Sequence, residues 1–277
     1  LLMPHAPGYP VHGARDGSDF DGDLFYLLDE DSHGGSILLL GRDGETLFLP
    51  KKSAREILFD GGDRDLIEVR RRTGLDDVRW MDELEAEMRK RLSLAFVFDR
   101  GKSPLSDLWL ANFGIEIRRA ALDIVGELRL IKDELEVSRL REAARLTASA
   151  QALVPTLELS QMSEWQIKTE FERHAFLQGA KQTAYTSIVA AGHSATTLHA
   201  RATDRQPVIG ELLLIDAGVK HRGYGSDLTR TWAVGKISPA AHDIHELVCA
   251  AVQRSITGLG KRLAAIVCES IVRMFGN

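Results

Sequence analysis

The sequence contains only two cysteines, Cys249 and Cys268, so it cannot form a disulfide framework. Both lie in helix-like sequence, where we expect buried, reduced thiols. No apolar run approaches the roughly 18 residues that a membrane helix requires. The first residues lack the basic and apolar regions of a signal peptide. A net charge of −5 gives no general attraction to nucleic acid or to anionic membranes. We therefore expect a cytoplasmic protein with no nucleic-acid partner and no membrane partner.

The remaining composition is that of an ordinary globular protein. Of the 277 residues, 44% are hydrophobic and 27% are charged. This length can form one large domain or two domains of ordinary size. The arrangement of predicted elements must therefore show how many domains are present.

The first part of the chain alternates predicted strands with a predicted helix. Residues 36–50, "SILLLGRDGETLFLP", place two β-prone runs around Asp43-Gly44, a pair typical of a type I′ hairpin turn. Residues 94–100 and 113–120 are further predicted strands, and residues 80–93, between the hairpin and the first of these strands, have helical character. This order predicts an α/β domain over residues 1–124.

Two helices with strong capping signals follow. In the stretch 128–154, Asp133 can cap a helix, and Glu136, three residues later, completes a capping box. In the second helix Ser163 is the predicted cap and Gln166 its partner.

A strand at 185–192 and a hairpin come next, and Ser238-Pro239 then opens another helix. Helices, strand, hairpin and helix together form the second predicted domain, residues 125–277.

The hairpin "LLLIDAGVKHRGYGSDLTRTW" carries two aspartates, Asp216 and Asp227. If the hairpin is centred on His221-Arg222, these two residues face each other with Cβ atoms roughly 5 Å apart. Carboxylates this close repel unless a cation lies between them. Oxygen ligands suit Mn²⁺, Mg²⁺ or Ca²⁺, and Zn²⁺ or Co²⁺ become candidates if an imidazole joins them. The alternative is that both aspartates are simply solvated at strand ends.

Three histidines are further candidates for site residues. His199, in "SATTLHAR", matters only if it reaches the same pocket, where it could donate a hydrogen bond to a polarised carbonyl. His242 and His245 are three residues apart, whereas the helical zinc motif requires four, so they are interpreted as a polar helix face.

The region 184–235 resembles the aminopeptidase P and prolidase family of pita-bread metallopeptidases. The matching motifs are a strand tyrosine, a Leu-His, "LLIDAG" and "GYGSDLTRT", in the order and spacing of the family. The stretch "ELRLIKDELEVSRLREAARLT" is similar to the helix that opens the family's catalytic domain. Residues 18–61 resemble the aminopeptidase P N-terminal domain. The resemblance extends to about residue 257 and implies an α/β N-terminal domain followed by a pita-bread α+β domain.

This resemblance implies a function and roles for particular residues. The implied reaction removes the N-terminal residue from peptides that have proline in second position. In the family two divalent ions, usually Mn²⁺, are held by two Asp, one His and two Glu. Asp216 and Asp227 match the two Asp ligands. His199 matches the histidine that stabilises the tetrahedral intermediate, and Tyr185 matches an active-site tyrosine, although it could equally be a core residue. Thr229 would support Asp227.

The chain departs from the family after Asp227. The remaining His and two Glu ligands belong to the second half of the pita-bread domain. The later His and Glu residues of this chain all lie in predicted helices: His242, His245, Glu246 and Glu269. The final twenty residues also fit the family poorly. We therefore expect an incomplete pita-bread domain and no peptidase activity from the 277-residue chain alone.

Three alternatives remain open. One is a metal-free hydrolase of the same fold, as in creatinase, against which the presence of both aspartates argues. Another is a non-catalytic binding protein on a pita-bread scaffold. The third is prolidase, which cleaves Xaa-Pro dipeptides. A homo-oligomer is compatible with each of them.

Overall fold

The structure is a computed structural model that describes residues 2–4, 22–29, 35–42, 44–62, 64–91, 94–97, 116–119 and 124–258. It consists of two compact units. The first comprises residues 1–143 with 184–186 and 220–225, and the second comprises residues 144–183, 187–219 and 226–277.

The first unit contains a mixed six-stranded sheet in the order β4-β3-β2-β1-β5-β6. Its strands are β1 (Leu2–Pro4), β2 (Ile37–Gly41), β3 (Gly44–Leu49), β4 (Asp77–Trp80), β5 (Leu94–Val97) and β6 (Glu116–Arg119). The predicted hairpin is confirmed, but Gly41 pairs with Gly44, so the turn lies one residue earlier than predicted. The α/β character expected of the N-terminal region follows from this sheet and its helices.

Five helices accompany this sheet among the described residues of the first unit. They are α1 (Gly22–Leu28), α2 (Ala54–Asp60), α3 (Leu66–Thr73), α4 (Leu84–Arg91) and α6 (Ile124–Leu130). A short 3₁₀ turn, Met81–Glu83, leads into α4. The buried core joins apolar residues of helices and strands: Leu24, Leu28, Leu38, Leu47, Leu49, Val69, Val78 and Val125.

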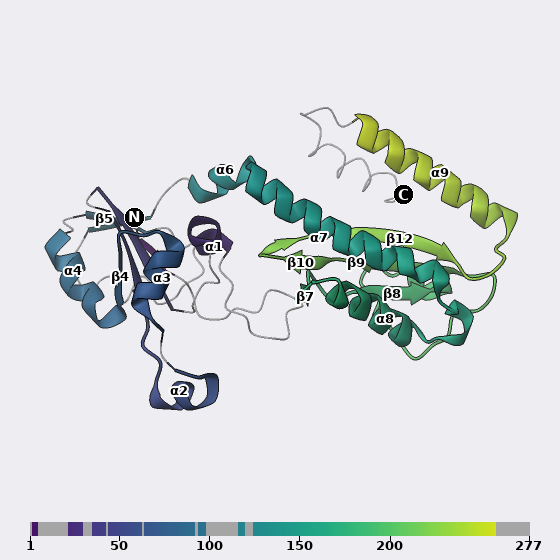
Figure 1. The fold of residues 1–277 in the computed structure, drawn as a ribbon. Coiled ribbons are helices and arrows are strands. Elements are labelled where there is room, and N and C mark those ends of the chain that lie inside the picture. The colour runs from purple at the N-terminus through teal and green to yellow at the C-terminus, as the bar shows by residue number, and fades with distance from the viewer. Residues whose placement is uncertain are drawn as a thin grey trace. The chain divides into compact units, whose positions relative to one another are not determined.

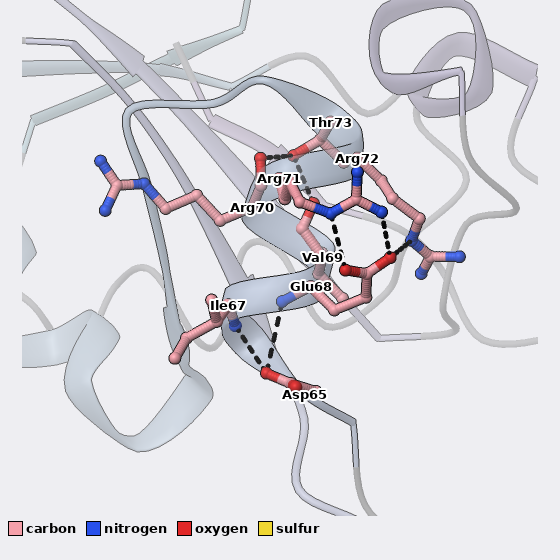
Figure 2. Close-up of polar contacts among 8 residues, drawn as sticks. All are labelled: Asp65, Ile67, Glu68, Val69, Arg70, Arg71, Arg72 and Thr73. Carbon is pink, nitrogen blue, oxygen red and sulfur yellow. Dashed lines mark hydrogen bonds and ion pairs between the residues drawn. The ribbon is translucent and has the colours of Figure 1, made fainter.

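Helix α3 shows how local sequence sets the ends of an element (Figure 2). The Asp65 carboxylate accepts hydrogen bonds from the backbone N–H groups of Ile67 and Glu68, at 2.9 and 3.3 Å. Gly74 ends the helix in the left-handed conformation, with φ of 72°. The Arg71 guanidinium donates two hydrogen bonds to Glu68 and lowers the pKa of that exposed carboxyl.

The second unit is built around the long helix α7 (Glu134–Leu153), whose N-terminal part belongs to the first unit, and helix α8 (Glu164–Leu177). Both predicted capping boxes are confirmed. The Asp133 side chain accepts from Glu136 N–H at 2.8 Å, and Asp133 N–H donates to the Glu136 carboxylate at 2.9 Å. Ser163 and Gln166 exchange the equivalent bonds.

A three-stranded antiparallel sheet lies behind these helices in the order β12-β9-β8 (Figure 1). Its strands are β8 (Ile188–Ala191), β9 (Leu212–Ala217) and β12 (Leu228–Ala233). Short strand β7 (Gln182–Thr183) and 3₁₀ turns Val154–Thr156, Leu159–Gln161 and Gly192–Thr196 complete this part. Strands β10 (Val219–His221) and β11 (Tyr224–Gly225) form the hairpin tip, whose residues 220–225 belong to the first unit. One sheet face is covered by α7 and α8 through a single buried cluster: Leu146, Ala150, Val154, Ile167, Phe171, Ala175, Val189, Ala191, Leu213, Ile215 and Ala217.

Helix α9 (Pro239–Gly258) begins as predicted, with Ala241 N–H donating to the Ser238 hydroxyl at 3.2 Å. It has no buried residue. Cys249 is therefore exposed, and the expectation that it is a buried thiol was wrong. Cys268 lies outside the described residues. No described helix is both long enough and apolar enough to cross a membrane.

Candidate metal centre

Asp216 lies near the end of β9, on the sheet face opposite the helices. Burial alternates along this strand, so that Leu213, Ile215 and Ala217 point into the core. Asp216 falls between them and is only partly exposed. The apolar run explains the strand, and the two-residue period of a strand explains why the carboxylate avoids the core.

The register of the hairpin differs from the prediction. Asp216 pairs with Thr229, not with Asp227. The reason is the turn: Arg222 and Gly223 both have positive φ, 45° and 81°, as a type I′ turn requires. The turn is therefore centred one residue later than predicted, and every cross-strand pair shifts by two.

Despite this shift of two residues, the register is compatible with both aspartates lying on one face of the sheet. Asp227 precedes Thr229 by two positions, and side chains two apart share a face of a strand. Asp227 lies one residue before β12, so its placement as a diagonal neighbour of Asp216, at roughly 7 Å, is an inference from the register of that strand. Asp227 is exposed. Thr229 is the direct partner of Asp216 across the ladder.

The two sides of the hairpin come close together at Gly218 and Ser226, just before Asp227. Ser226 N–H donates to the Val219 carbonyl at 3.0 Å, and Val219 N–H donates to the Ser226 hydroxyl at 3.1 Å. The buried Thr147 hydroxyl lies 2.7 Å from the same Ser226 oxygen. Opposite, a Cβ on Gly218 would lie 1.8 Å from the Ser226 carbonyl oxygen. These contacts fix the backbone position of Ser226 and therefore of Asp227, which follows it. Neither Thr147 nor Ser226 could be predicted from the sequence, because their partners are distant along the chain.

A buried glutamine joins the sheet to α7. Gln151 donates to the Ile215 and Leu228 carbonyls at 3.2 and 3.1 Å, and its oxygen accepts from Trp232 Nε1 at 3.1 Å. It therefore ties together the strands that carry Asp216 and Thr229.

Replacing this glutamine should destabilise the protein strongly. Gln151→Leu keeps the volume but leaves two carbonyls and an indole N–H without their partner, so we expect a loss of about 2 to 4 kcal/mol of unfolding free energy. Urea unfolding measures it. Gln161→Leu, at an exposed site, should change the unfolding free energy little, and equal losses in both variants would contradict this role.

The hairpin tip is fastened to the first half of α7 within the first unit. Tyr224 donates its hydroxyl to Glu136 at 2.9 Å, and its ring packs edge-on against Phe25, 6.3 Å between centroids. Arg139 lies over the same ring at 5.7 Å, and its two terminal nitrogens donate to Asp29 at 2.5 and 2.7 Å. Hydrogen bonding to Arg139 lowers the pKa of Asp29. Desolvation, then the Glu136 bond, raises the pKa of Tyr224 to about 12.

This pKa predicts a pH dependence. An unfolded tyrosine titrates near about 10, so the folded state holds the Tyr224 proton more tightly. The contribution to stability is complete below that pH and is lost as pH rises through about 12. Tyrosinate absorbance should show a late-titrating group that Tyr224→Phe removes. A titration that is identical in the variant would contradict the assignment.

His199 and Tyr185 lie in less regular segments. His199 follows the 3₁₀ turn Gly192–Thr196 and is exposed. Tyr185 is partly buried and precedes β8, which begins at Ile188 and not at residue 185 as predicted. In the part of the chain that the structure describes, no three His, Cys, Asp or Glu side chains gather closely enough to hold a metal. The structure therefore does not bring His199 and the two aspartates into one ligand cluster.

Comparison with known proteins gives these residues a context. Residues 138–271 match metallopeptidase family M24. This match covers just under half of the chain. It is 28% identical over 210 residues to a probable Xaa-Pro aminopeptidase of Verticillium alfalfae, a match that covers 73% of this chain and 45% of the relative. The chain thus spans about half the length of the curated relatives it matches.

Solved structures agree on the fold. Aminopeptidase P from Escherichia coli superposes with a TM-score of 0.79 at 22% identity, covering 92% of this chain and 62% of that one. An Xaa-Pro dipeptidase from Bacillus anthracis gives 0.70 at 20% identity, covering 92% and 65%. The chain therefore has the fold of these structures over the part it covers, an α/β N-terminal part followed by an incomplete α+β pita-bread domain.

Proposed function

We propose that this chain is the N-terminal domain and first catalytic half of a metal-dependent exopeptidase of the Xaa-Pro aminopeptidase type. Such an enzyme removes the N-terminal residue from peptides with proline in second position. The observation that carries the proposal is the M24 match over residues 138–271, which includes both Asp216 and Asp227. The proposed domain limits are 1–124 and 125–277, and the proposed location is the cytoplasm.

Asp216 and Asp227 are the residues that would hold divalent ions, with Mn²⁺ as the proposed metal. Their hard carboxylate oxygens have the correct chemistry, and the register is compatible with a common face. When bound, such ions polarise the scissile carbonyl and acidify water. His199 would donate a hydrogen bond to the oxygen that gains negative charge, and Tyr185 would be an active-site tyrosine near the metal-bound solvent.

Two carboxylates are an incomplete ligand set, because hard cations take six or more oxygen ligands. The described residues supply no third ligand nearby. We therefore expect no peptidase turnover from the purified 277-residue chain. Appreciable hydrolysis of an Xaa-Pro peptide, abolished by Asp227→Ala, would contradict that expectation.

The absence of a third ligand among the described residues also favours a second candidate, a non-catalytic binding protein on the same scaffold. A further candidate is prolidase, since one of the structural neighbours is described as an Xaa-Pro dipeptidase. Dipeptide and tripeptide substrates discriminate between the two enzymes.

The test uses the native protein, purified from its own source with an antibody against this chain. We expect release of the N-terminal residue from an Xaa-Pro tripeptide, stimulated by Mn²⁺ and abolished by EDTA, with no release from an Xaa-Ala peptide. Preference for the Xaa-Pro dipeptide would indicate prolidase. No release under any metal condition would overturn the enzyme proposal and leave the binding protein.

A further inference from the structure

Glu164, the first residue of α8, is a buried carboxylate to which the reaction assigns no role. Only 1% of its surface is exposed. One carboxylate oxygen accepts from Ala191 N–H at 2.9 Å and from the Ser194 hydroxyl at 3.2 Å. The other accepts from Thr203 N–H at 3.0 Å and from the Thr203 hydroxyl at 2.8 Å. Burying a carboxylate is costly unless it is fully hydrogen-bonded, so this arrangement is specific.

These partners lie on both sides of His199 in the sequence. Ala191 and Ser194 precede it and Thr203 follows it, so one carboxylate holds both ends of the segment 191–203. The start of α8 strengthens the second attachment. Trp165 N–H donates to the Thr203 carbonyl at 3.0 Å, and Glu164 N–H donates to the Arg205 carbonyl at 2.9 Å. The first amides of a helix have no partner within the helix, and here the segment supplies it.

Between its two ends, the segment begins with the 3₁₀ turn Gly192–Thr196, which lies against β8 and β9, and Ala202 packs on the core cluster near the other end. Two further turn hydrogen bonds follow, Thr197 N–H to the Ser194 carbonyl at 3.1 Å and Ala200 N–H to the Thr197 carbonyl at 3.2 Å. Leu198 is 88% exposed, and His199 beside it is also exposed. The position of His199 therefore depends on how this exposed tip is held at its two ends.

We propose that Glu164 is a positioning residue that closes the segment 191–203 and thereby sets where His199 is presented. The closure is a property of the fold, whereas its consequence for turnover rests on the proposed function. Glu164→Gln isolates the effect, because one carboxylate oxygen becomes an NH₂ group that cannot accept from Ala191 or Thr203. One end of the segment then loses its attachment while the size and shape of the side chain are retained.

The test measures amide hydrogen exchange and the His199 ring NMR signals in the full chain. In Glu164→Gln we expect exchange across 191–203 to rise at least tenfold, with a much smaller change at Leu213 and Ile215 in β9. The His199 signals should move toward those of a free histidine. Glu170→Gln, which alters the partly exposed partner of Arg173 on the same helix, should leave both readouts unchanged.

Two outcomes would overturn the proposal. Unchanged exchange across 191–203 would show that Glu164 does not close the segment, and an equal rise in β9 would show that it only stabilises the whole unit. If Glu164→Gln does not fold, Thr203→Val serves instead. It removes one donor to the carboxylate and should raise exchange at the Thr203 end alone, and an unchanged rate there would equally contradict the closure.

Turnover by the native-length protein separates this inference from the proposed function. If the wild-type protein cleaves Xaa-Pro peptides, Glu164→Gln should lower kcat with little change in KM. An open segment with unchanged kcat would overturn the link to His199. A wild-type protein without peptidase activity would instead count against the proposed function, and the exchange result would still decide whether Glu164 closes the segment.

Discussion

Gly218→Ala should unfold the hairpin that carries Asp216 and Asp227. The added Cβ would lie 1.8 Å from the Ser226 carbonyl oxygen and 2.7 Å from the Ser226 carbonyl carbon. These are backbone atoms, so no side-chain rotation can relieve the clash and the strands must separate. We expect a loss of at least about 3 kcal/mol of unfolding free energy, measured by urea denaturation.

Gly225→Ala is the matched control within the same hairpin. Its Cβ would meet only the Ala184 Cβ, at 3.4 Å, which is an ordinary van der Waals contact. It should therefore change the unfolding free energy little. Wild-type stability in Gly218→Ala would show that the strands do not approach so closely before Asp227, and the proposed placement of that aspartate would fail with it.

Phe171→Ala should lower the unfolding free energy to a similar extent. Phe171 packs on the helix-covered face of the sheet, opposite the face that carries Asp216. The Phe171 side chain is 1% exposed and joins α8 to the cluster that includes Val189 and Ile215. Its removal leaves a cavity between helix and sheet, and we expect a loss of about 3 to 5 kcal/mol. Because Asp216 lies on the other face of the same sheet, the loss should appear as one cooperative unfolding transition that includes the strand carrying it.

Phe176→Ala tests whether burial is the cause. Phe176 lies on the same helix but is 41% exposed, so truncation there creates no closed cavity. Thermal unfolding of the two variants should differ clearly, with the midpoint of Phe171→Ala much lower. Similar midpoints would mean that α8 does not pack on the sheet through Phe171.

The features that could be predicted from the sequence are those determined by neighbouring residues. The capping boxes at Asp133 and Ser163 need partners only three residues away, and both formed as predicted. The hairpin register failed by two residues, because it depends on which positions of "KHRGYG" take positive φ. Gly223 was the signal for the correct turn, since glycine accepts that conformation most readily.

The contacts that organise the candidate site could not be predicted, because they join distant segments. Glu164 reaches Ala191 and Thr203, and Thr147 reaches Ser226. No periodicity or spacing encodes such pairs, and only the folded chain brings them together. The exposure of Cys249 has a similar cause, because a helix pattern alone does not show whether another element covers the helix.

The central claim is that Asp216 and Asp227 form a divalent-metal site. The most direct measurement is paramagnetic broadening of the amide NMR signals of the 277-residue chain on addition of Mn²⁺, which detects even weak binding at individual residues. We predict broadening centred on Asp216 and Asp227 that disappears in Asp227→Asn, with Asp243→Asn on α9 as the unchanged control. Broadening that persists in Asp227→Asn, or that is centred elsewhere, would contradict the proposed metal site.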